Sequence, residues 1–381
     1  MKKLLLLVLL AISMSVNAQT PSSVRWVRNQ TELRKAIADC NATGSPTKIE
    51  LSNSFTVGDS IQWITRAIPF EISGNNSTIT VNSVSGTLFY LDAPNMAASE
   101  KMIDAAPYIH NGIFRNNRGT GNCLRLSSTY MGKIEQCQFW GFKDAIYLPR
   151  AMSMEICNNR FWNGKGWYIT LTCKGITGGN SSTAQPNTSS VHDNCFRVDS
   201  LSNGAILIEG GSLIPIYHNV IEGGTKFHNG SEYGILSDYC GSPNVKSSNI
   251  NMNHFEVRFG KAAVKVRQND GFINYANNYR QYGGLELEVD NDGGYPQVNY
   301  SYQDYIVNNA SAGYTTWKGS GAVWNFEGLP SSAKETSVSM WGDGIIPFYR
   351  LSRGFGEGAT KYPYERMNPA IQINGVTIRP Q

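Results

Sequence analysis

The chain has 381 residues, of which 16% are charged and 11% aromatic, with 38 glycines and a formal net charge of +4. A chain of this length can bury a large core and usually forms two or three domains. So small a net charge argues against nucleic acid or a membrane surface as a partner. Sparse charge with abundant glycine, asparagine and aromatic residues is typical of a turn-rich all-β protein.

The first 18 residues have the features of an export signal. Lys2 and Lys3 precede an apolar run over residues 4–12, and residues 16–18 form a small-residue cleavage site that leaves Gln19 as the new terminus. Nine apolar residues are too few to cross a bilayer as a permanent anchor. We therefore expect a secreted, periplasmic or cell-surface protein without an integral membrane anchor.

Residues 19–47 are predicted to form a strand and a helix that caps the rest of the chain. The strand covers residues 24–27, and Asn29 with Glu32 three positions later is typical of a helix N-terminus. Apolar residues then follow at helical spacing, at Leu33, Ala36, Ile37 and Cys40. Strand-like segments come next, at residues 48–51, 69–72 and 78–81.

One short pattern recurs five times between residues 134 and 255. It consists of a β-branched apolar residue, usually an Asn three positions later, and a large apolar residue after two more. The copies are Ile134-Cys137-Phe139, Ile156-Asn159-Phe161, Val191-Asn194-Phe196, Ile216-Asn219-Ile221 and Ile250-Asn253-Phe255, with weaker copies at Ile109-Gly112-Phe114 and Asn277-Tyr279. From residue 112 to residue 277 the steps are 25, 22, 35, 25, 34 and 24 residues. A period near 24 with two insertions indicates a solenoid.

The recurring Asn has a physical role at the bend between two strands. Its side chain can satisfy buried backbone donors and acceptors, and Asn tolerates left-handed backbone angles. Stacked amides would then form a hydrogen-bonded ladder, in which Cys137 takes one Asn position.

The seven cysteines are an odd number and do not indicate a disulfide scaffold. We expect buried thiols, with a Cys137–Cys157 disulfide as an alternative, and no Cys–His spacing indicates zinc.

Several segments together resemble the pectin-lyase-like family of right-handed parallel β-helix proteins. They are TELRKAIADC, KIEL, ICNNRF, VHDNCF, YHNVIE and NMNHFE, spread over roughly residues 24–290. The resemblance implies an all-β right-handed parallel β-helix solenoid over residues 48–310 with an N-terminal capping helix. An aromatic, glycine-rich segment, residues 311–381, is expected to pack on or cap the coil. The same coil carries lyases, hydrolases, tail-spikes and adhesins, so the fold alone does not assign an activity.

The second strand of each coil predicts one charged row on the outer surface. Because strand side chains alternate faces, the neighbours of its apolar positions point outward. Stacked strands lie about 4.8 Å apart. The predicted row is Glu209, Asp238, Arg267 and Asp290, with Tyr147, Lys265 and Glu288 in the adjacent column.

This row suggests β-elimination of an acidic glycan, which requires a base and neutralisation of the sugar carboxylate. Glu209 and Asp238 are candidate Ca²⁺ ligands, and Lys265 or Arg267 is the candidate base. The resemblance implies the same assignment of roles to the acidic and basic residues, since lyases of this family pair Ca²⁺-binding acids with a basic residue on this face. The adjoining candidate substrate contacts are Glu288, Asp290 and Tyr147.

Two other interpretations of the row stay open. Carboxylates one coil apart approach the separation of about 5–5.5 Å found in retaining glycosidases. The hydrolase branch of the family, however, has the motifs NTD, DD, HG and RIK, and none occurs here. Opposite charges on a solvated sheet can also simply pair with each other.

A separate surface is predicted at Trp140 and Trp162, which fall in the same register one coil apart. Outward indoles would form a platform for sugar rings, so both are candidate substrate contacts. The alternative, slightly favoured by the sequence, is that a loop or the C-terminal segment covers them. The histidines, scattered over several coils, are interpreted as surface residues.

The sequence thus predicts an exported β-helix that binds polysaccharide and cleaves it as a lyase. The alternative is a non-catalytic adhesin or a tail-spike-like receptor-binding protein. Outward Leu207 and Leu236 favour the alternative, since exposed leucines suggest a covered or trimeric surface, and both monomer and homotrimer stay open. The insertions at residues 173–188 and 238–247 are expected to flank the charged row.

Overall fold

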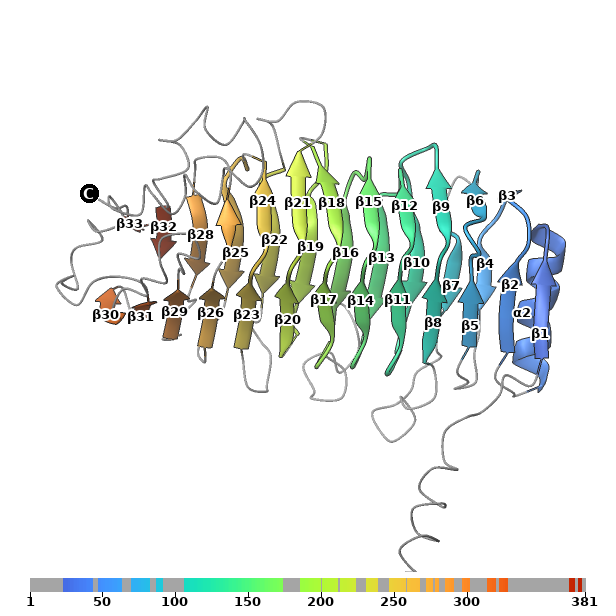
Figure 1. Ribbon diagram of the computed structural model, residues 1–381, viewed down its shortest axis with the longest axis horizontal. Helices are drawn as coiled ribbons and strands as arrows, with labels where there is room; N and C mark the ends of the chain where they lie inside the picture. Colours follow the sequence, from blue (N-terminus) through green and yellow to red (C-terminus); the bar gives the residue numbers. More distant parts are fainter. Residues whose placement is uncertain are drawn as a thin grey trace, which may run out of the picture.

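Three short strands repeat along the chain, and equivalent strands of successive coils pair in parallel (Figure 1). The computed structural model describes residues 23–43, 47–63, 70–82, 87–91, 106–173, 186–199, 201–211, 213–223, 231–238, 247–257, 259–267, 272–276, 278–280, 285–290, 297–301, 314–319, 322–327, 370–373 and 376–378. The fold is a right-handed parallel β-helix, as the sequence predicts.

The strands form three sheets, here named A, B and C. Sheet A contains β1 (Ser23–Val27), β2 (Thr47–Leu51), β5 (Phe70–Ser73), β8 (Pro107–His110), β11 (Lys133–Glu135), β14 (Glu155–Cys157), β17 (Ser190–His192), β20 (Ile214–Tyr217), β23 (Ser247–Asn251), β26 (Phe272–Ala276), β29 (Gln297–Ser301), β31 (Ala322–Glu327) and β30 (Tyr314–Gly319). Sheet B contains β3 (Phe55–Val57), β6 (Thr78–Val81), β9 (Ile113–Asn116), β12 (Gln138–Trp140), β15 (Arg160–Trp162), β18 (Cys195–Val198), β21 (Val220–Gly223), β24 (His254–Glu256) and β27 (Tyr279–Arg280). Sheet C contains β4 (Ile61–Trp63), β7 (Phe89–Leu91), β10 (Asn122–Leu126), β13 (Asp144–Pro149), β16 (Trp167–Thr172), β19 (Gly204–Glu209), β22 (Tyr233–Asp238), β25 (Ala262–Arg267), β28 (Leu285–Asp290), β32 (Ala370–Ile373) and β33 (Val376–Ile378).

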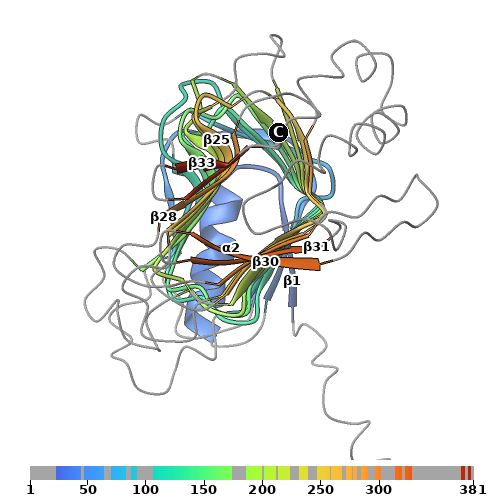
Figure 2. The same cartoon turned by 90° about the vertical axis from the view of Figure 1, so that its left-hand side faces the viewer.

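The helix α2 (Gln30–Thr43) covers the N-terminal end of the coil (Figure 2). Its first turn is capped as predicted, because the Glu32 N–H donates to Asn29 Oδ1 at 2.9 Å. All four predicted apolar positions are buried against the first coil, at Leu33, Ala36, Ile37 and Cys40. The open apolar end of the solenoid is thereby shielded from water.

The core consists of like residues stacked from coil to coil. Four phenylalanines of sheet B, Phe114, Phe139, Phe161 and Phe196, stack with ring centroids 5.4, 5.0 and 4.7 Å apart. Inward residues of sheet A form a second column, at Ile49, Ile72, Ile109, Ile134, Ile156, Val191, Ile216 and Ile250, each at most 1% exposed. This regular burial fixes which residues of each strand must point outward.

A ladder of buried asparagines joins the coils at the bend between sheets A and B. The backbone N–H of each ladder residue donates to the Oδ1 of the next at 3.0–3.1 Å, through Cys137, Asn159, Asn194, Asn219, Asn253 and Asn278. Each ladder Asn also donates through Nδ2 to a backbone carbonyl on the sheet A strand of the preceding coil. The ladder therefore satisfies backbone groups that have no access to water.

Two details of the predicted ladder are wrong. The last member is Asn278, not Asn277, because Tyr275 pairs in register with Ile250 and sets the frame of that coil. Residue 277 itself lies outside the described residues. The left-handed backbone angle is found at the residue before the ladder position, as at Asp193 with φ 54° and Met252 with φ 51°. The bend residue faces outward, which leaves the Asn side chain free to point inward and bond.

Strands beyond residue 310 extend two of the sheets. β31 pairs in parallel with β29, and β32 pairs in parallel with β28, but each then meets an antiparallel partner. Most of residues 311–381, the two predicted insertions and the predicted export signal lie outside the described residues. Among the described residues, no helix has the length and apolar character needed to span a bilayer.

The cysteines lie where the strand pattern predicts, but not as a disulfide pair. The six described cysteines are free thiols. Cys157 is in register with Glu135, whereas Cys137 belongs to the ladder. The alternative of a Cys137–Cys157 disulfide is therefore wrong.

Candidate functional site

The charged row predicted on sheet C is present in the register that the sequence indicates. Glu209 pairs with Asp238, Asp238 with Arg267, and Arg267 with Asp290. In the adjacent column, Lys265 pairs in register with Glu288. The Asp290 side chain lies outside what the structure describes.

The charged side chains of this row bond to one another. Lys265 Nζ lies 2.6 Å from Glu288 Oε1, and Tyr233 donates its hydroxyl to Glu288 Oε2 at 3.2 Å. Arg267 lies 3.6 Å from the Asp238 carboxylate. Burial, followed by the charge of Glu288, raises the pKa of Tyr233. The candidate base Lys265 is thus held in an ion pair with a carboxylate.

The candidate Ca²⁺ ligands have protein partners on the same face. Thr172 donates its hydroxyl to Glu209 Oε2 at 3.0 Å. Within the described part of the chain, neither Glu209 nor Asp238 belongs to a group of three or more potential metal-ligand side chains. Farther along the face, the Arg125 guanidinium lies over the rings of Tyr90 and Tyr147, 5.5 and 5.2 Å from their centroids. Tyr147 thus packs in a cation–π stack on the coil.

The indole pair on sheet B forms a platform that is exposed at Trp140. Trp140 and Trp162 are in register, with ring centroids 5.9 Å apart, and Trp140 is 43% exposed. The expectation that another segment covers both indoles is therefore wrong for Trp140, while Trp162 is half-buried. Arg115 precedes Trp140 in the same column and Arg197 follows Trp162.

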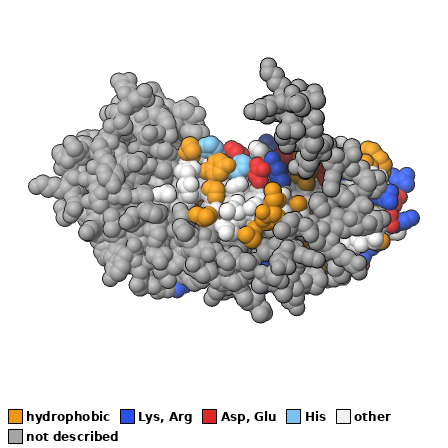
Figure 3. All heavy atoms as spheres, turned by 90° about the horizontal axis from the view of Figure 1, so that it is seen from below, with side chains coloured by type: hydrophobic (Ala, Val, Ile, Leu, Met, Phe, Trp, Pro, Cys, Tyr) orange, Lys and Arg blue, Asp and Glu red, His pale blue; other side chains and the backbone are white. Residues whose placement is uncertain are grey.

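A third surface, which the sequence analysis does not predict, lies on the outer face of sheet A. Figure 3, seen from below, shows histidine, acidic and basic side chains gathered on this side of the molecule. Glu71 accepts from Lys48 at 3.1 Å and lies 2.9 Å from His110 Nε2. Burial alone would raise the pKa of Glu71, but its bonds to His110 and Lys48 lower it. Tyr108 stacks on His110 with ring centroids 4.3 Å apart.

This network continues into the next coils through paired charges. Tyr108 donates to Glu135 at 2.6 Å, and Lys133 lies 3.0 Å from Glu135 and 3.3 Å from Glu155. Burial and then the bond to Glu135 raise the pKa of Tyr108 to about 12. The hydrogen bond to Glu135 is the largest cause of a raised pKa for Lys133.

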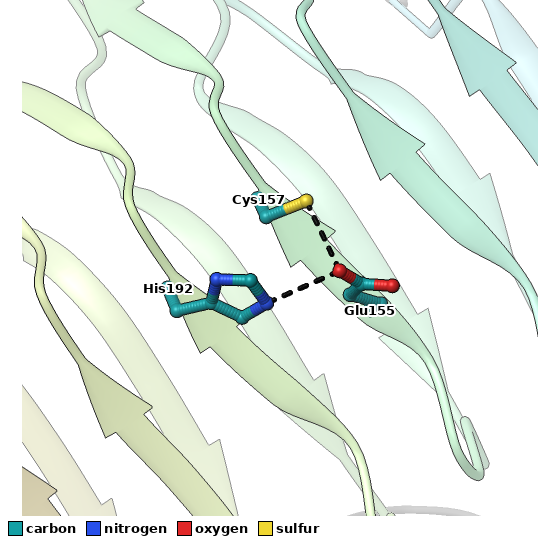
Figure 4. A group of neighbouring side chains, drawn as sticks. All are labelled: Glu155, Cys157 and His192. Carbon is teal, nitrogen blue, oxygen red and sulfur yellow. Dashed lines mark hydrogen bonds and ion pairs between the residues drawn. The ribbon is translucent and has the colours of Figure 1, made fainter.

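At the centre of the network, Glu155, Cys157 and His192 converge (Figure 4). Glu155 Oε1 lies 3.4 Å from Cys157 Sγ and 3.3 Å from His192 Nε2. Within the described residues, this is the group of His, Cys, Asp and Glu side chains whose ligand atoms all lie within 4.8 Å of one another. Burial and then Glu155 raise the pKa of the Cys157 thiol to about 12. Cys157 is thus a buried free thiol, as expected, and its Sγ also has a carboxylate partner in Glu155.

The signal for this group was present in the sequence. Ile156 and Val191 are inward residues of the repeat, so their neighbours on either side must point outward. The alternation of faces that predicts the columns of sheet C therefore also predicts Glu155, Cys157 and His192 on one face of sheet A. His192 and His110 do lie on separate coils, as expected, yet both belong to carboxylate networks rather than to a bare surface.

The search for similar proteins adds no family assignment. No protein-family model matches the chain, and no curated protein matches it.

Proposed function

We propose that this protein is an exported β-helix that binds an acidic polysaccharide through the outer face of sheet B. The observation that carries the proposal is the in-register pair of indoles on adjacent strands, the exposed Trp140 and the half-buried Trp162. A rigid aromatic surface can hold the apolar face of a sugar ring at little cost in side-chain entropy.

The charges around the indoles favour an acidic glycan. Arg115 and Arg197 lie at the two ends of the pair, and Arg160 lies in the neighbouring column. Arg115 and Arg160 are exposed, and a guanidinium can bind a carboxylate through two parallel hydrogen bonds. Three strand spacings of about 4.8 Å separate Arg115 from Arg197, or roughly 14 Å, which is the length of a short oligosaccharide.

The same column changes sign beyond the arginines. Glu222 follows Arg197 in register, and Glu256 follows Glu222. An anionic glycan would be repelled by these carboxylates, so the change of charge between Arg197 and Glu222 marks one end of the binding surface. This asymmetry also favours a fixed direction for the bound glycan.

The test is calorimetric titration of uronate oligosaccharides and of neutral oligosaccharides of the same length. We expect binding of the uronates alone, with affinity at least about tenfold weaker in Trp140→Ala and Trp162→Ala. Trp26→Ala is the matched control, because Trp26 is 62% exposed on β1, far along the coil from the indole pair. Equal affinity for neutral glycans, or unchanged binding in both indole variants, would refute the proposal.

A second candidate activity is cleavage of the same glycan by β-elimination on sheet C. The observation in its favour is that Lys265, Tyr233 and Glu288 meet there, since such groups can hold and transfer protons. In this scheme Glu209 and Asp238 would hold Ca²⁺ against the sugar carboxylate. The test is ultraviolet absorbance of unsaturated products with and without Ca²⁺. Product formation that is lost in Lys265→Met supports the activity, and no product on any uronate polymer excludes it.

A further inference from the structure

We propose that Glu155, Cys157 and His192 form a binding site for a divalent transition-metal ion, and that Zn²⁺ is the ion that suits it best. The site lies on sheet A, apart from the indole platform on sheet B and the charged row on sheet C. It does not depend on the proposed binding of glycan.

Two of the separations between donor atoms match those around one shared ion, and all three ligand atoms lie within 4.8 Å of one another. Glu155 Oε1 is 3.4 Å from Cys157 Sγ and 3.3 Å from His192 Nε2. Around a tetrahedral zinc ion, with bonds of about 2.0–2.3 Å, neighbouring ligand atoms lie roughly 3.3–3.7 Å apart. A single ion between the three atoms therefore requires only small side-chain movements (Figure 4).

Both nitrogens of the His192 ring face carboxylate oxygens. Nδ1 lies 2.7 Å from Asp193 Oδ2, while Nε2 lies 3.3 Å from Glu155 Oε1. A neutral imidazole can donate only one hydrogen bond, so one nitrogen would otherwise place a lone pair against a carboxylate. A metal ion between Nε2 and Glu155 removes that conflict, and a doubly protonated ring is the competing solution.

The groups around His192 match those that orient metal-binding histidines. A carboxylate on the far nitrogen fixes the tautomer, and here Asp193 takes that position. The Tyr217 ring stacks on the imidazole, with centroids 4.6 Å apart and ring planes 7° apart. The imidazole is thus held in one orientation before any ion binds.

The backbone beneath the site is equally fixed. Cys157 and His192 are in register on paired strands, and Glu155 lies two residues before Cys157 on the same strand. Ile156 and Val191, both 0% exposed, anchor these strands in the core. Ligands on rigid strands hold their geometry better than ligands on loops.

A lysine ammonium already lies beside Glu155, and a metal ion would have to replace it there. Lys133 lies 3.3 Å from Glu155 Oε1, but it has a closer partner in Glu135 at 3.0 Å. Lys133 can therefore stay with Glu135 while Glu155 turns to the ion. Binding would release the thiol proton of Cys157 to solvent, because thiolate is the form that coordinates metal.

The donor set selects the kind of ion. Thiolate and imidazole favour zinc and related transition metals over Ca²⁺ and Mg²⁺, which prefer oxygen ligands. Three protein ligands leave a fourth position of a tetrahedral ion for water. The Glu155 side chain is 40% exposed, so this fourth position can exchange with solvent.

The first test is direct measurement of metal binding. The purified chain, dialysed against a chelator, would be titrated with Zn²⁺ in competition with a chromophoric chelator. We expect one high-affinity equivalent per chain, with affinity at least about 100-fold weaker in Cys157→Ser and His192→Gln. Asp193→Asn is expected to weaken binding by about 10–100-fold through loss of orientation. Cys195→Ser and His110→Gln are matched controls on outward positions that do not belong to the group, and should bind normally.

The second test needs no variant. X-ray absorption at the zinc edge of the wild-type complex should show one sulfur and at least two nitrogen or oxygen ligands. Lack of a high-affinity equivalent, or a zinc shell without sulfur, would overturn the proposal. Normal binding in folded Cys157→Ser would have the same consequence.

Discussion

Replacing Asn219 by Ala tests whether the buried amides hold the coils together. Asn219 is 0% exposed; its Oδ1 accepts from the Asn194 N–H at 3.1 Å, and its Nδ2 donates to the Val191 carbonyl at 3.0 Å. The variant leaves both backbone groups buried without the side chain that bonds them. At about 1–3 kcal/mol for each group, we expect a loss of about 2–6 kcal/mol.

The measurement is urea-induced unfolding followed by circular dichroism. The matched control is Asn117→Ala, since Asn117 is an exposed asparagine that lies outside the ladder, and its change should stay within about 0.5 kcal/mol. Because each coil contacts only its neighbours, a defect in the middle of the ladder should also broaden the transition. If Asn219→Ala unfolds at the same urea concentration as the control, the ladder does not carry the stability assigned to it.

Three further outcomes follow from local geometry. Burial would raise the pKa of Glu71, but its histidine and lysine partners lower this pKa below the ordinary 4.5. The ionised Glu71 carboxylate therefore stabilises the fold above that pH, and this contribution is lost on acidification. Glu71→Gln should flatten the fall in urea stability below about pH 4.5, and an unchanged pH profile would contradict this. Gly141→Ala should cost about 2 kcal/mol or more, because Gly141 has φ +75° and an added Cβ would meet the Asn116 carbonyl. Gly58→Ala is the control, because an added Cβ there would meet only Gln30 Oε1 at an ordinary contact distance of 3.9 Å; equal melting temperatures would refute the argument. Met252→Asn should raise stability by about 0.5–1 kcal/mol, because Met252 is exposed at φ 51° and Asn tolerates that angle better; a lower melting temperature would oppose it.

The coil could be predicted from the sequence because each repeat has the same short register. The spacing from the β-branched residue to the Asn and then to the aromatic residue is a local property. It was sufficient to place Phe161 over Phe139 and Asn194 over Asn159. It failed by one residue at Asn278, where two adjacent asparagines fit the spacing and only strand pairing chooses between them.

The surfaces could be predicted only in part. Alternation of faces gave the columns of sheet C and the register of Trp140 with Trp162, because period-two patterning is also local. Whether those indoles are exposed depends on what packs over them, and the expected cover is wrong for Trp140, which is 43% exposed. Lys265 was predicted as a base, but its rotamer and that of Glu288 place the two in an ion pair.

The sequence by itself determined the coil, its period, its capping helix and the direction in which each strand residue points. These follow from burial of apolar residues at fixed local spacing, and neighbouring coils only repeat them. The meeting of Glu155 and Cys157 with His192 was decided by tertiary structure. The repeat predicts that β14 and β17 are neighbours and that all three side chains point outward. The side-chain rotamers that bring the three ligand atoms within 4.8 Å of one another depend on the packing around them, which local spacing does not encode.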